Sequence, residues 1–587
     1  MKNSVKKLSP GTLKRILCYV GKYPIATVCS LLLAVVTVGS TLLAPIYFGD
    51  AIDCIVEGNV RWEELTALFV KTGVAVAITM LSQWLMSLCN NYVSCNVVRD
   101  IRKDAFAKIG ALPLQYLDSH SHGDTVSRII ADADQFSDGL LMGFTQFFTG
   151  IMTILGTIAF MLMTHVWIGL VVIFATPASL FVAKFVSTRT YKYFQAQTRT
   201  RGEQTAFVEE TITGLKTVQA FAREDENQAK FDEINERLEK AALQATFFSS
   251  LTNPSTRFIN NLIYALVALL GALAVVSGSG FTVGGLQKFL SYANQYTKPF
   301  NEISGVVTEL KSAFACAERI FALMDEKEEI SDAGKCCLSN VQGNVDLRNV
   351  SFSYVKDKPL IENLNLEVLQ GQRVAIVGKT GSGKTTLINL LMRFYDVDGG
   401  QVCVENTDIR DITRQSLRKN YGMVLQETWL KSATVKENIS LGNPDTSDEE
   451  IVRAAKAAHA HGFIKRLSNG YDTVLGEDGG GLSEGQKQLL CIARILLLLP
   501  PMLILDEATS SIDTRTELKI SDAFHKLMQG RTSFVVAHRL STIVNSDVIL
   551  VMENGSVVEK GSHKELLERR GAYYRLYQSQ FELVASE

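Results

Sequence analysis

The sequence predicts two domains of different kinds, a helical membrane domain followed by an α/β domain. At 587 residues the chain exceeds one domain. Long apolar runs with few charges are confined to residues 25–315, and a glycine-rich loop between a short apolar strand and a helical stretch lies beyond them. We therefore expect a cytosolic segment at 1–24, a membrane domain at 25–315, a linker at 316–340 and the α/β domain at 341–587.

Composition excludes several classes of protein. The net charge is −2, so no basic excess indicates a nucleic-acid partner. The ten cysteines form no C-x-x-C pair, and we interpret them as small buried hydrophobic residues, without a metal site or disulfide framework. Residues 1–24 are basic, but no small-residue cleavage site follows the apolar run, so we expect no removed signal peptide.

Six stretches are long enough to cross a membrane, since a bilayer core needs about 20 apolar residues per helix. They are Ile25–Gly49, Leu68–Tyr92, Gly139–Met163, Trp167–Val186, Arg257–Val276 and Val283–Phe314. The connections between spans two and three and between four and five are long and rich in Lys and Arg, whereas the short connections hold Arg61 and, at a margin, Lys71. The positive-inside rule places the long connections and both termini in the cytosol. We expect the long connections to be helical extensions of the spans.

Two parts of this region invite functional interpretations. Phe207–Phe221 has apolar residues near helical spacing with a break at Gly214, so it is either a piece that docks on the α/β domain or a solvated linker helix. Charges in span six are costly at membrane depth, and they either pair along the helix, as Lys298 and Glu302 would, or face a substrate path. The remaining candidates for the path are Glu309, Lys311, Gln83, Asn90, Asn91, Asn260, Asn261 and Asn294, and each amide would serve equally as a contact between helices.

The glycine-rich loop fits the phosphate-binding pattern G-x-x-x-x-G-K-[ST]. It follows the apolar strand Val374–Val377 and precedes a helix at Thr386–Phe394, which is the context that this P-loop requires. Backbone N–H groups would surround phosphate oxygens, Lys384 would supply positive charge and Thr385 a hydroxyl for Mg²⁺. The expected nucleotide-binding residues here are Gly378, Lys379, Thr380, Gly381, Ser382, Gly383, Lys384, Thr385 and Thr386.

A second apolar strand, Met502–Leu505, ends in two carboxylates. Asp506 would hold Mg²⁺ through water, and Glu507 would accept a proton from an attacking water. A simple loop start is the alternative interpretation, and the P-loop disfavours it.

Together these motifs resemble those of ATP-binding cassette (ABC) exporters, and the resemblance covers essentially the whole chain. Further positions match the family: Tyr354 the aromatic residue that stacks on adenine, Gln426 the loop glutamine that senses Mg²⁺, Leu482–Gln486 the signature, Asp513 the loop at the dimer interface and His538 the switch histidine. The resemblance implies a six-helix transmembrane domain with long cytosolic helical extensions and an α/β P-loop ATPase domain. It also implies ATP and Mg²⁺ as cofactors, with Thr385, Gln426 and Asp506 at the metal.

The family's working cycle follows from the resemblance. Two nucleotide domains face each other, and each ATP lies between the P-loop of one and Ser483, Gly485 and Gln486 of the other. Closure on ATP turns the membrane domains outward, and hydrolysis resets them. Glu507 and His538 are the expected catalytic residues, and catalysis consists of positioning and charge stabilisation.

Glu484 departs from the family signature, which has glycine at this position. At about 6 Å from one phosphate charge, the Glu484 carboxylate would experience a repulsion of roughly 3 kcal/mol at an effective dielectric of ~20. In bulk water the same repulsion would be under ~1 kcal/mol. Alternatively, Ser483 and Gln486 form a capping box, and Glu484 points outward in a first helical turn that favours acidic residues. A complete P-loop site beside an altered signature resembles one subunit of a heterodimeric bacterial exporter.

The expected function is ATP-driven efflux of drugs, lipids or peptides across the bacterial plasma membrane, with the nucleotide domain in the cytoplasm. A second half-transporter is the expected partner, in a heterodimer rather than a homodimer, along with the bilayer and a hydrophobic or amphipathic substrate. A soluble cassette ATPase is disfavoured by the six spans, and an importer by the fusion of both domains. Glu507 and His538 favour a transporter over a channel or a non-transport regulator. The sequence does not identify the substrate.

Overall fold

The chain folds into two units. The computed structural model describes residues 10–56, 61–277, 281–355, 358–425, 428–441, 443, 445–476, 479–506, 512–536 and 543–585. Residues 1–111 and 120–326 belong to the first, which we call the helical unit. Residues 112–119 and 327–587 form the second unit, which we call the sheet unit. Residues 327–340, expected to belong to a linker, therefore lie in the sheet unit.

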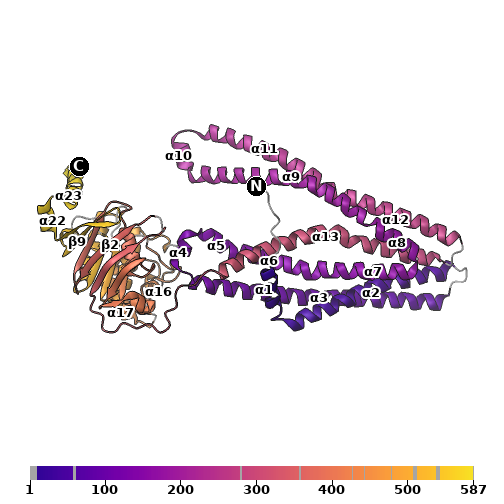
Figure 1. Ribbon diagram of the computed structural model, residues 1–587, viewed down its shortest axis with the longest axis horizontal. Coiled ribbons are helices and arrows are strands. Elements are labelled where there is room, and N and C mark those ends of the chain that lie inside the picture. The colour runs from indigo at the N-terminus through magenta and orange to yellow at the C-terminus, as the bar shows by residue number, and fades with distance from the viewer. Residues whose placement is uncertain are drawn as a thin grey trace. The chain divides into compact units, whose positions relative to one another are not determined.

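The helical unit consists of long helices (Figure 1). Its described helices are α1 (Pro10–Val20), α2 (Pro24–Val56), α3 (Trp62–Ala111), α5 (His122–Ile129), α6 (Ala131–Met142), the π-helix η1 (Gly143–Phe148), α7 (Thr149–Thr164), α8 (Val166–Ala175), α9 (Pro177–Thr213), α10 (Leu215–Ala220), α11 (Glu224–Ser250), α12 (Thr252–Val276) and α13 (Val283–Met324). Helix α3 has 50 residues, hence a length of about 75 Å. This is more than twice the ~30 Å of a bilayer core, so α3 extends beyond the membrane.

The predicted count of six spans is not confirmed. Within the described residues, four helical stretches are long and apolar enough to cross a membrane: Pro24–Ile55, Trp62–Ala111, His122–Thr164 and Glu224–Val276. Predicted span four is divided between the shorter apolar helix α8 and α9, which begins at Pro177, a residue without an N–H to donate. Predicted span six falls in α13, where polar side chains such as Lys288 and Lys298 lower the hydropathy.

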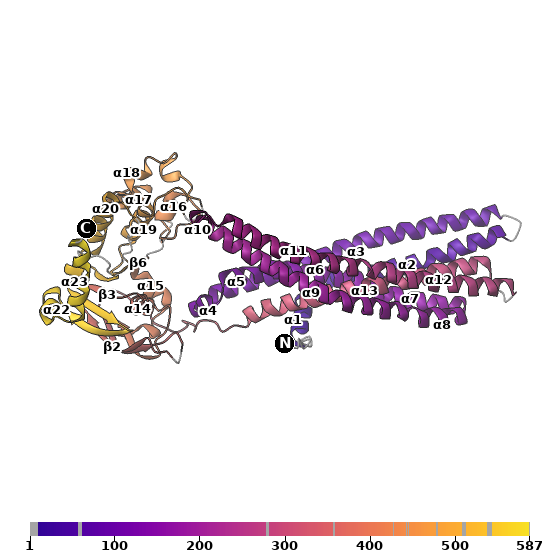
Figure 2. The same ribbon diagram turned by 90° about the horizontal axis from the view of Figure 1, so that it is seen from above.

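Helices α9 and α11 lie side by side in both views of the molecule (Figures 1 and 2). The short helix α10 joins them and belongs to the helical unit. Ile212, Leu215 and Phe221 are exposed there. Residues 112–119, which include α4 (Leu114–Ser119), belong to the sheet unit. Whether 207–221 docks on an α/β domain stays a prediction.

The sheet unit contains two sheets. The antiparallel one has the order β2 (Ile361–Val368), β1 (Val345–Phe352), β4 (Gly399–Val404), β5 (Thr407–Asp408). The other has the order β10 (Ser556–Gly561), β9 (Val548–Glu553), β3 (Arg373–Gly378), β8 (Thr532–Val536), β7 (Met502–Asp506), β6 (Tyr421–Val424). Strands β9, β3, β8, β7 and β6 run parallel to one another, and β10 pairs antiparallel to β9.

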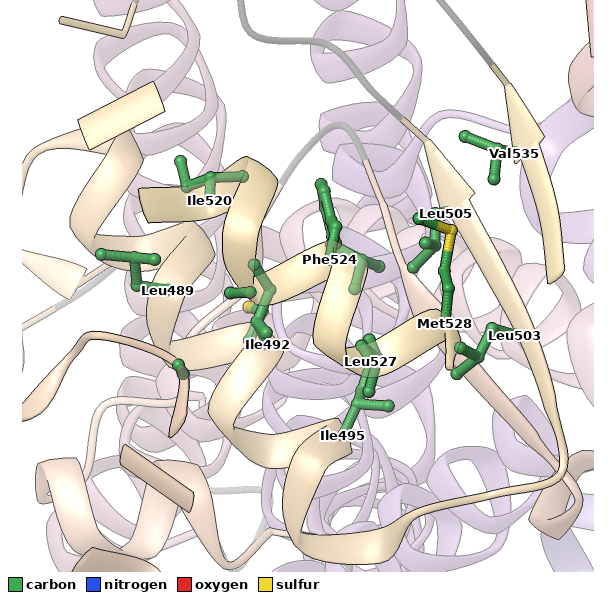
Figure 3. Packing of buried hydrophobic residues seen from close by; sticks show 14 of the residues in the cluster. Leu489, Ile492, Ile495, Leu503, Leu505, Ile520, Phe524, Leu527, Met528 and Val535 are labelled. Atoms are coloured by element: carbon green, nitrogen blue, oxygen red, sulfur yellow. The ribbon is translucent and has the colours of Figure 1, made fainter. Parts of the chain in front are cut away.

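Helices cover these sheets and complete two hydrophobic clusters. The described helices are α14 (Lys384–Leu391), η2 (Ile409–Asp411), α15 (Arg414–Lys419), α16 (Val435–Ile439), α17 (Asp448–Ala457), α18 (His461–Ile464), η3 (Gly470–Asp472), α19 (Glu484–Leu498), α20 (Thr514–Met528), α22 (His563–Arg569) and α23 (Ala572–Ala585). One cluster packs α19 and α20 against β7 and β8 (Figure 3). The other includes residues of β1, β2 and β4 together with α14. The parallel strands are buried on both faces, which explains the continuous apolar run Met502–Leu505.

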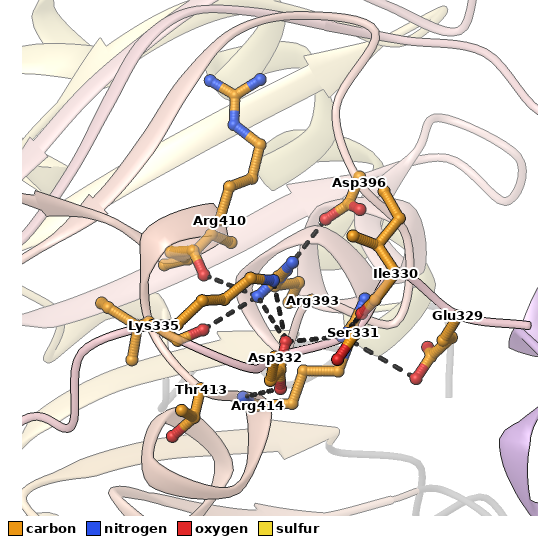
Figure 4. A network of polar contacts seen from close by, with 12 residues as sticks. Glu329, Ile330, Ser331, Asp332, Lys335, Arg393, Asp396, Arg410, Thr413 and Arg414 are labelled. Atoms are coloured by element: carbon orange, nitrogen blue, oxygen red, sulfur yellow. Dashed lines mark hydrogen bonds and ion pairs between the residues drawn. The ribbon is translucent and has the colours of Figure 1, made fainter.

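A polar network fixes residues 329–335 to the sheet unit (Figure 4). Asp332 accepts hydrogen bonds from the Arg414 backbone N at 2.6 Å, from Arg414 Nη1 at 2.8 Å and from Lys335 Nζ at 2.8 Å. Glu329 also pairs with Arg414, at 3.4 Å. Burial alone would raise the pKa of Asp332, but the contacts with Lys335 and Arg414 outweigh it and hold this pKa below its ordinary value.

Candidate nucleotide-binding site

The P-loop lies between β3 and α14. Gly378, Gly381 and Gly383 have φ angles of 155°, 82° and 99°, which glycine adopts without strain. A Cβ on Gly378 would lie 2.3 Å from the carbonyl oxygen of Met552, so a side chain would clash with β9. This backbone path suits a loop whose N–H groups surround phosphate oxygens at a helix N-terminus.

Lys384 is held inside the loop. Its side chain is buried, and Nζ donates to the carbonyl oxygens of Gly378 at 2.8 Å and Lys379 at 3.0 Å. Burial lowers the pKa of Lys384, and the charge of Asp506 partly opposes this effect. The carbonyl oxygens carry partial charges, so a phosphate would be a stronger partner for this ammonium group.

The other loop side chains differ in exposure. Lys379, Thr380 and Thr385 are exposed, whereas Ser382 and Thr386 are buried. Ser382 Oγ has no hydrogen-bond partner within the part of the chain that the structure describes. A buried hydroxyl in a phosphate-binding loop fits a site completed by a ligand, because buried polar groups are normally paired.

Strand register brings Asp506 to the same edge of the sheet as the P-loop. Strand β8 lies between β3 and β7, and its Val536 pairs with both Ile376 and Asp506. The carboxyl ends of these three parallel strands therefore meet. Asp506 and Thr385 present the hard oxygen donors that Mg²⁺ prefers, and phosphate oxygens would have to complete its coordination. Among the residues described, no group of three or more His, Cys, Asp or Glu side chains is placed to hold a metal by itself.

Three predicted residues, Gln426, Glu507 and His538, lie outside the described residues. Glu507 directly follows Asp506 in the sequence, and β8 ends two residues before His538.

Tyr354 has an aromatic environment. Its ring packs edge-on against Phe352 at a centroid distance of 4.9 Å and against Tyr395 at 5.1 Å. Asn389 Nδ2 of α14 donates to the Tyr354 hydroxyl at 3.3 Å. Tyr354 remains 39% exposed, so a ring surface is open to a nucleotide base. Sequence reasoning missed Tyr395 and Asn389, because their proximity to Tyr354 depends on the tertiary cluster to which β1 and α14 both contribute.

The signature begins helix α19. Ser483 is its N-cap, and the capping box is present: Ser483 N donates to Gln486 Oε1 at 3.0 Å, and Gln486 N to Ser483 Oγ at 3.4 Å. A Cβ on Gly485 would lie 2.5 Å from Thr516 Cγ2, so glycine permits the close approach of α20. Asp513 is the N-cap of α20, and the hydrogen bond from the Thr516 N–H lowers its pKa.

The Glu484 carboxylate contacts two side chains of its own chain. Lys487 Nζ lies 2.7 Å from Glu484 Oε1, and Thr428 Oγ1 donates to Oε2 at 3.4 Å. The Glu484 side chain is 55% exposed, while that of Lys487 is 15% exposed. The ion pair partly offsets the negative charge in the signature, and sequence reasoning missed both partners.

The candidates for the membrane path are dispersed over several environments. Gln83, Asn91, Asn261, Asn294, Lys298 and Lys311 are exposed, and Asn260 is half-buried. Asn90 is buried and accepts a hydrogen bond from Ser30, so it joins α3 to α2. Glu309 accepts a hydrogen bond from Gln135 at 2.8 Å, joining α13 to α6. The Glu302 side chain lies outside the described part, so the predicted pair with Lys298 stays a prediction.

Comparisons with known proteins agree with these motifs. The model of the ABC transporter transmembrane region matches residues 27–300, and the ABC transporter model matches residues 361–510. The ABC transporter ATP-binding protein YfiC of Bacillus subtilis is 38% identical over 99% of this chain and 96% of its own length. A fatty acid ABC transporter ATP-binding/permease protein of Mycobacterium bovis is 42% identical over 88% of this chain and 81% of its own.

A solved structure also resembles the whole chain. The structure of a bacterial Atm1-family ABC exporter with ATP bound aligns with a TM-score of 0.76 and 29% identity, covering 97% of this chain and 99% of that one. This chain therefore belongs to the ABC transporter family, as an exporter that joins a transmembrane region to an ATP-binding domain and couples ATPase activity to transport.

Proposed function

We propose that this chain exports hydrophobic or amphipathic compounds as one subunit of a heterodimer, by alternating access. The observation that carries the pairing is the contrast between a complete P-loop and an altered signature at Glu484. The substrate class is supported by relatives named for fatty acid transport and for multidrug export, the latter YgaD of Bacillus subtilis at 35% identity.

The proposed hydrolytic site combines this chain's P-loop with the partner's signature. Tyr354 stacks on adenine, the loop Gly378–Thr386 binds the phosphates, and Lys384 offsets their charge. Thr385, Gln426 and Asp506 hold Mg²⁺, which offsets charge on the phosphates when bound. Glu507 orients or deprotonates the attacking water, and His538 stabilises the γ-phosphate. Positioning and charge stabilisation supply most of the rate enhancement in phosphoryl transfer.

The second proposed site is weaker. Ser483, Gly485 and Gln486 of this chain meet the ATP bound to the partner's P-loop. Glu484 adds bulk there, and its charge is partly offset by Lys487 at 2.7 Å. We expect slow closure and little hydrolysis at this second site.

The proposed membrane arrangement has six spans in a bacterial plasma membrane, with the nucleotide domain in the cytoplasm. The match of the family's transmembrane region to residues 27–300 supports it, because this range contains α8 and most of predicted span six. Charged cytosolic parts of α9 and α11 agree with the same orientation.

Expression of this chain alone and together with a candidate partner, a half-transporter encoded beside its gene, tests the proposal. We expect the pair to show ATPase activity stimulated by palmitate or an amphipathic dye, and Glu507→Gln in this chain to reduce it at least ~100-fold. Full stimulated activity from this chain alone would contradict the heterodimer. Retained activity in Glu507→Gln would contradict the assignment of that residue.

A further inference from the structure

The hydroxyl end of Tyr354 is tied to the helix that follows the P-loop. Asn389 of α14 donates from Nδ2 to the Tyr354 hydroxyl at 3.3 Å. Asn389 lies five residues after Lys384, the first residue of α14, so their Cα atoms are about 7.5 Å apart along the helix axis. One short helix therefore carries both the lysine of the phosphate loop and the amide that contacts the proposed adenine-stacking residue.

The backbone beside Tyr354 is held without Asn389. Leu360 N donates to the Phe352 carbonyl oxygen at 3.1 Å, which joins the two ends of the segment that carries Tyr354. The turn between β9 and β10 also packs here. Gly555 N donates to the Ser382 carbonyl oxygen at 3.1 Å, and a Cβ on Gly555 would lie 1.2 Å from the Leu360 carbonyl oxygen. Substitution of Asn389 should therefore release the Tyr354 side chain and leave the backbone in place.

The Tyr354 ring is constrained at both ends of its long axis. Its Cβ follows the backbone, and its hydroxyl is bonded to Asn389. A change of rotamer at χ1 would move the hydroxyl, whereas rotation about χ2 would not, because Cβ and the hydroxyl oxygen lie on the χ2 axis. Phe352 and Tyr395 restrict χ2, since their rings contact the Tyr354 ring at interplanar angles of 85° and 90°. The ring thus has both a fixed position and a fixed tilt.

A ring that is already fixed favours stacking for an entropic reason. A side chain that is ordered before a ligand arrives has little rotamer freedom left to lose on binding. The bond to Asn389 removes this freedom at χ1, and an aliphatic residue at position 389 would restore it. The orientation of Tyr354 therefore depends on an amide that belongs to the P-loop helix.

We propose that Asn389 is a positioning residue, which holds Tyr354 in the rotamer that stacks on a base and so makes this site favour a nucleoside triphosphate over a bare triphosphate. Asn389 acts through the Tyr354 hydroxyl. The inference rests on the proposed function, in which Tyr354 stacks on adenine, and it extends base recognition to a residue of α14.

Ligand binding to the full transporter, reconstituted in nanodiscs with its partner, tests the role of Asn389. Two probes separate the base from the phosphates: the non-hydrolysable analogue AMP-PNP with Mg²⁺, and inorganic tripolyphosphate with Mg²⁺. We expect Asn389→Leu to weaken AMP-PNP binding about fivefold and tripolyphosphate binding less than about twofold, because one hydrogen bond near the base is lost. The ATPase KM should rise about fivefold while kcat stays within about twofold, since binding changes and the catalytic groups do not.

A double-mutant cycle with Tyr354→Phe tests whether Asn389 acts through the hydroxyl. Tyr354→Phe keeps the ring and removes the hydroxyl, so it should weaken AMP-PNP binding as much as Asn389→Leu does, about fivefold. Adding Asn389→Leu to Tyr354→Phe should then change this affinity less than about twofold, because the two residues share one interaction. Tyr354→Phe also keeps the test decisive if Asn389→Leu folds poorly.

Three results would overturn the proposal. The first is wild-type binding of both probes by Asn389→Leu. The second is equal weakening of both probes, which a merely structural role would give. The third is a further loss in the double variant as large as in Asn389→Leu alone, because Asn389 would then act without the Tyr354 hydroxyl.

Asn420→Leu is the matched control. Asn420 is also half-buried in the sheet unit, but its Nδ2 donates to the Ser416 carbonyl oxygen at 2.8 Å. This variant should bind both probes like the wild type. A selective loss of AMP-PNP affinity equal to that of Asn389→Leu would contradict a specific role for Asn389.

Tyr354→Leu separates this inference from the proposed function. A loss of AMP-PNP affinity of about tenfold, with tripolyphosphate binding unchanged, supports the stacking role of Tyr354. If AMP-PNP affinity is unchanged, the role of Tyr354 is wrong and that of Asn389 fails with it. If the affinity falls while Asn389→Leu and Tyr354→Phe bind like the wild type, the role of Asn389 alone is wrong.

Discussion

At the residue scale, Lys384 and Lys379 make a matched pair within one loop. Lys384 is buried with Nζ against loop carbonyl oxygens, whereas the Lys379 side chain is exposed. We expect Lys384→Met to lower the ATPase kcat by roughly 10²–10³-fold, because a preorganised positive charge near the transferred phosphoryl group is lost. Lys379→Met keeps the backbone N–H and should change kcat less than about threefold. Similar losses in both variants would contradict this division of roles.

Two substitutions at Glu484 separate the effect of its charge on nucleotide binding from the effect of its size. We expect Glu484→Gln to strengthen nucleotide binding at the second site about threefold and Glu484→Gly about tenfold, because the first removes charge and the second also removes bulk. Fluorescent ATP-analogue binding in a Glu507→Gln background measures both. Unchanged affinity in Glu484→Gly would mean that this side chain, already paired with Lys487, does not disturb the site.

At the scale of elements, the segment 329–335 depends on the Asp332 carboxylate. Its pKa is lower in the folded state than in the unfolded chain, so its stabilising contribution is complete above the unfolded pKa of about 3.9 and is lost as pH falls through the folded value. We expect Asp332→Asn to weaken docking of this segment by about 2 kcal/mol at pH 7. The rate of limited proteolysis near residue 328 measures how firmly this segment is docked.

A matched variant exists on β1, where Asp346 pairs with Arg348 at the surface. Asp346→Asn should leave proteolysis of the segment unchanged, because an exposed ion pair contributes about 0–1 kcal/mol. If Asp332→Asn is cleaved no faster than Asp346→Asn, the network in Figure 4 does not hold the segment.

The positions of helices and strands were predicted accurately where residue types and their local spacing determine them. The strand before the P-loop, the strand ending at Asp506 and the Ser483 capping box were all expected from residue type and spacing. The membership of residues 112–119 in the sheet unit was less predictable. Residues 112–119 are too short to show a periodic pattern, and their place in the sheet unit depends on long-range contacts such as Tyr395 with Asp118.

At the scale of the whole molecule, topology is the property to test. The proposed arrangement of six spans would place His165 and Ser277 outside the cell and Ser119 in the cytosol. In a cysteine-free background, we expect His165→Cys and Ser277→Cys to react with a membrane-impermeant maleimide in intact cells. Ser119→Cys should react only after permeabilisation. Protection of His165→Cys in intact cells would show that α8 and α9 do not complete the fourth span.

By itself the sequence determined the family, the order of the domains and the ATP-binding loop, because these depend on composition and on motifs contiguous in the chain. Tertiary structure decided which residues support the site. Tyr395 and Asn389 contact Tyr354, and Lys487 and Thr428 contact Glu484. Such contacts join residues up to 277 positions apart, as between Asp118 and Tyr395. No local pattern encodes them, because they follow from burying several amphipathic elements against one another.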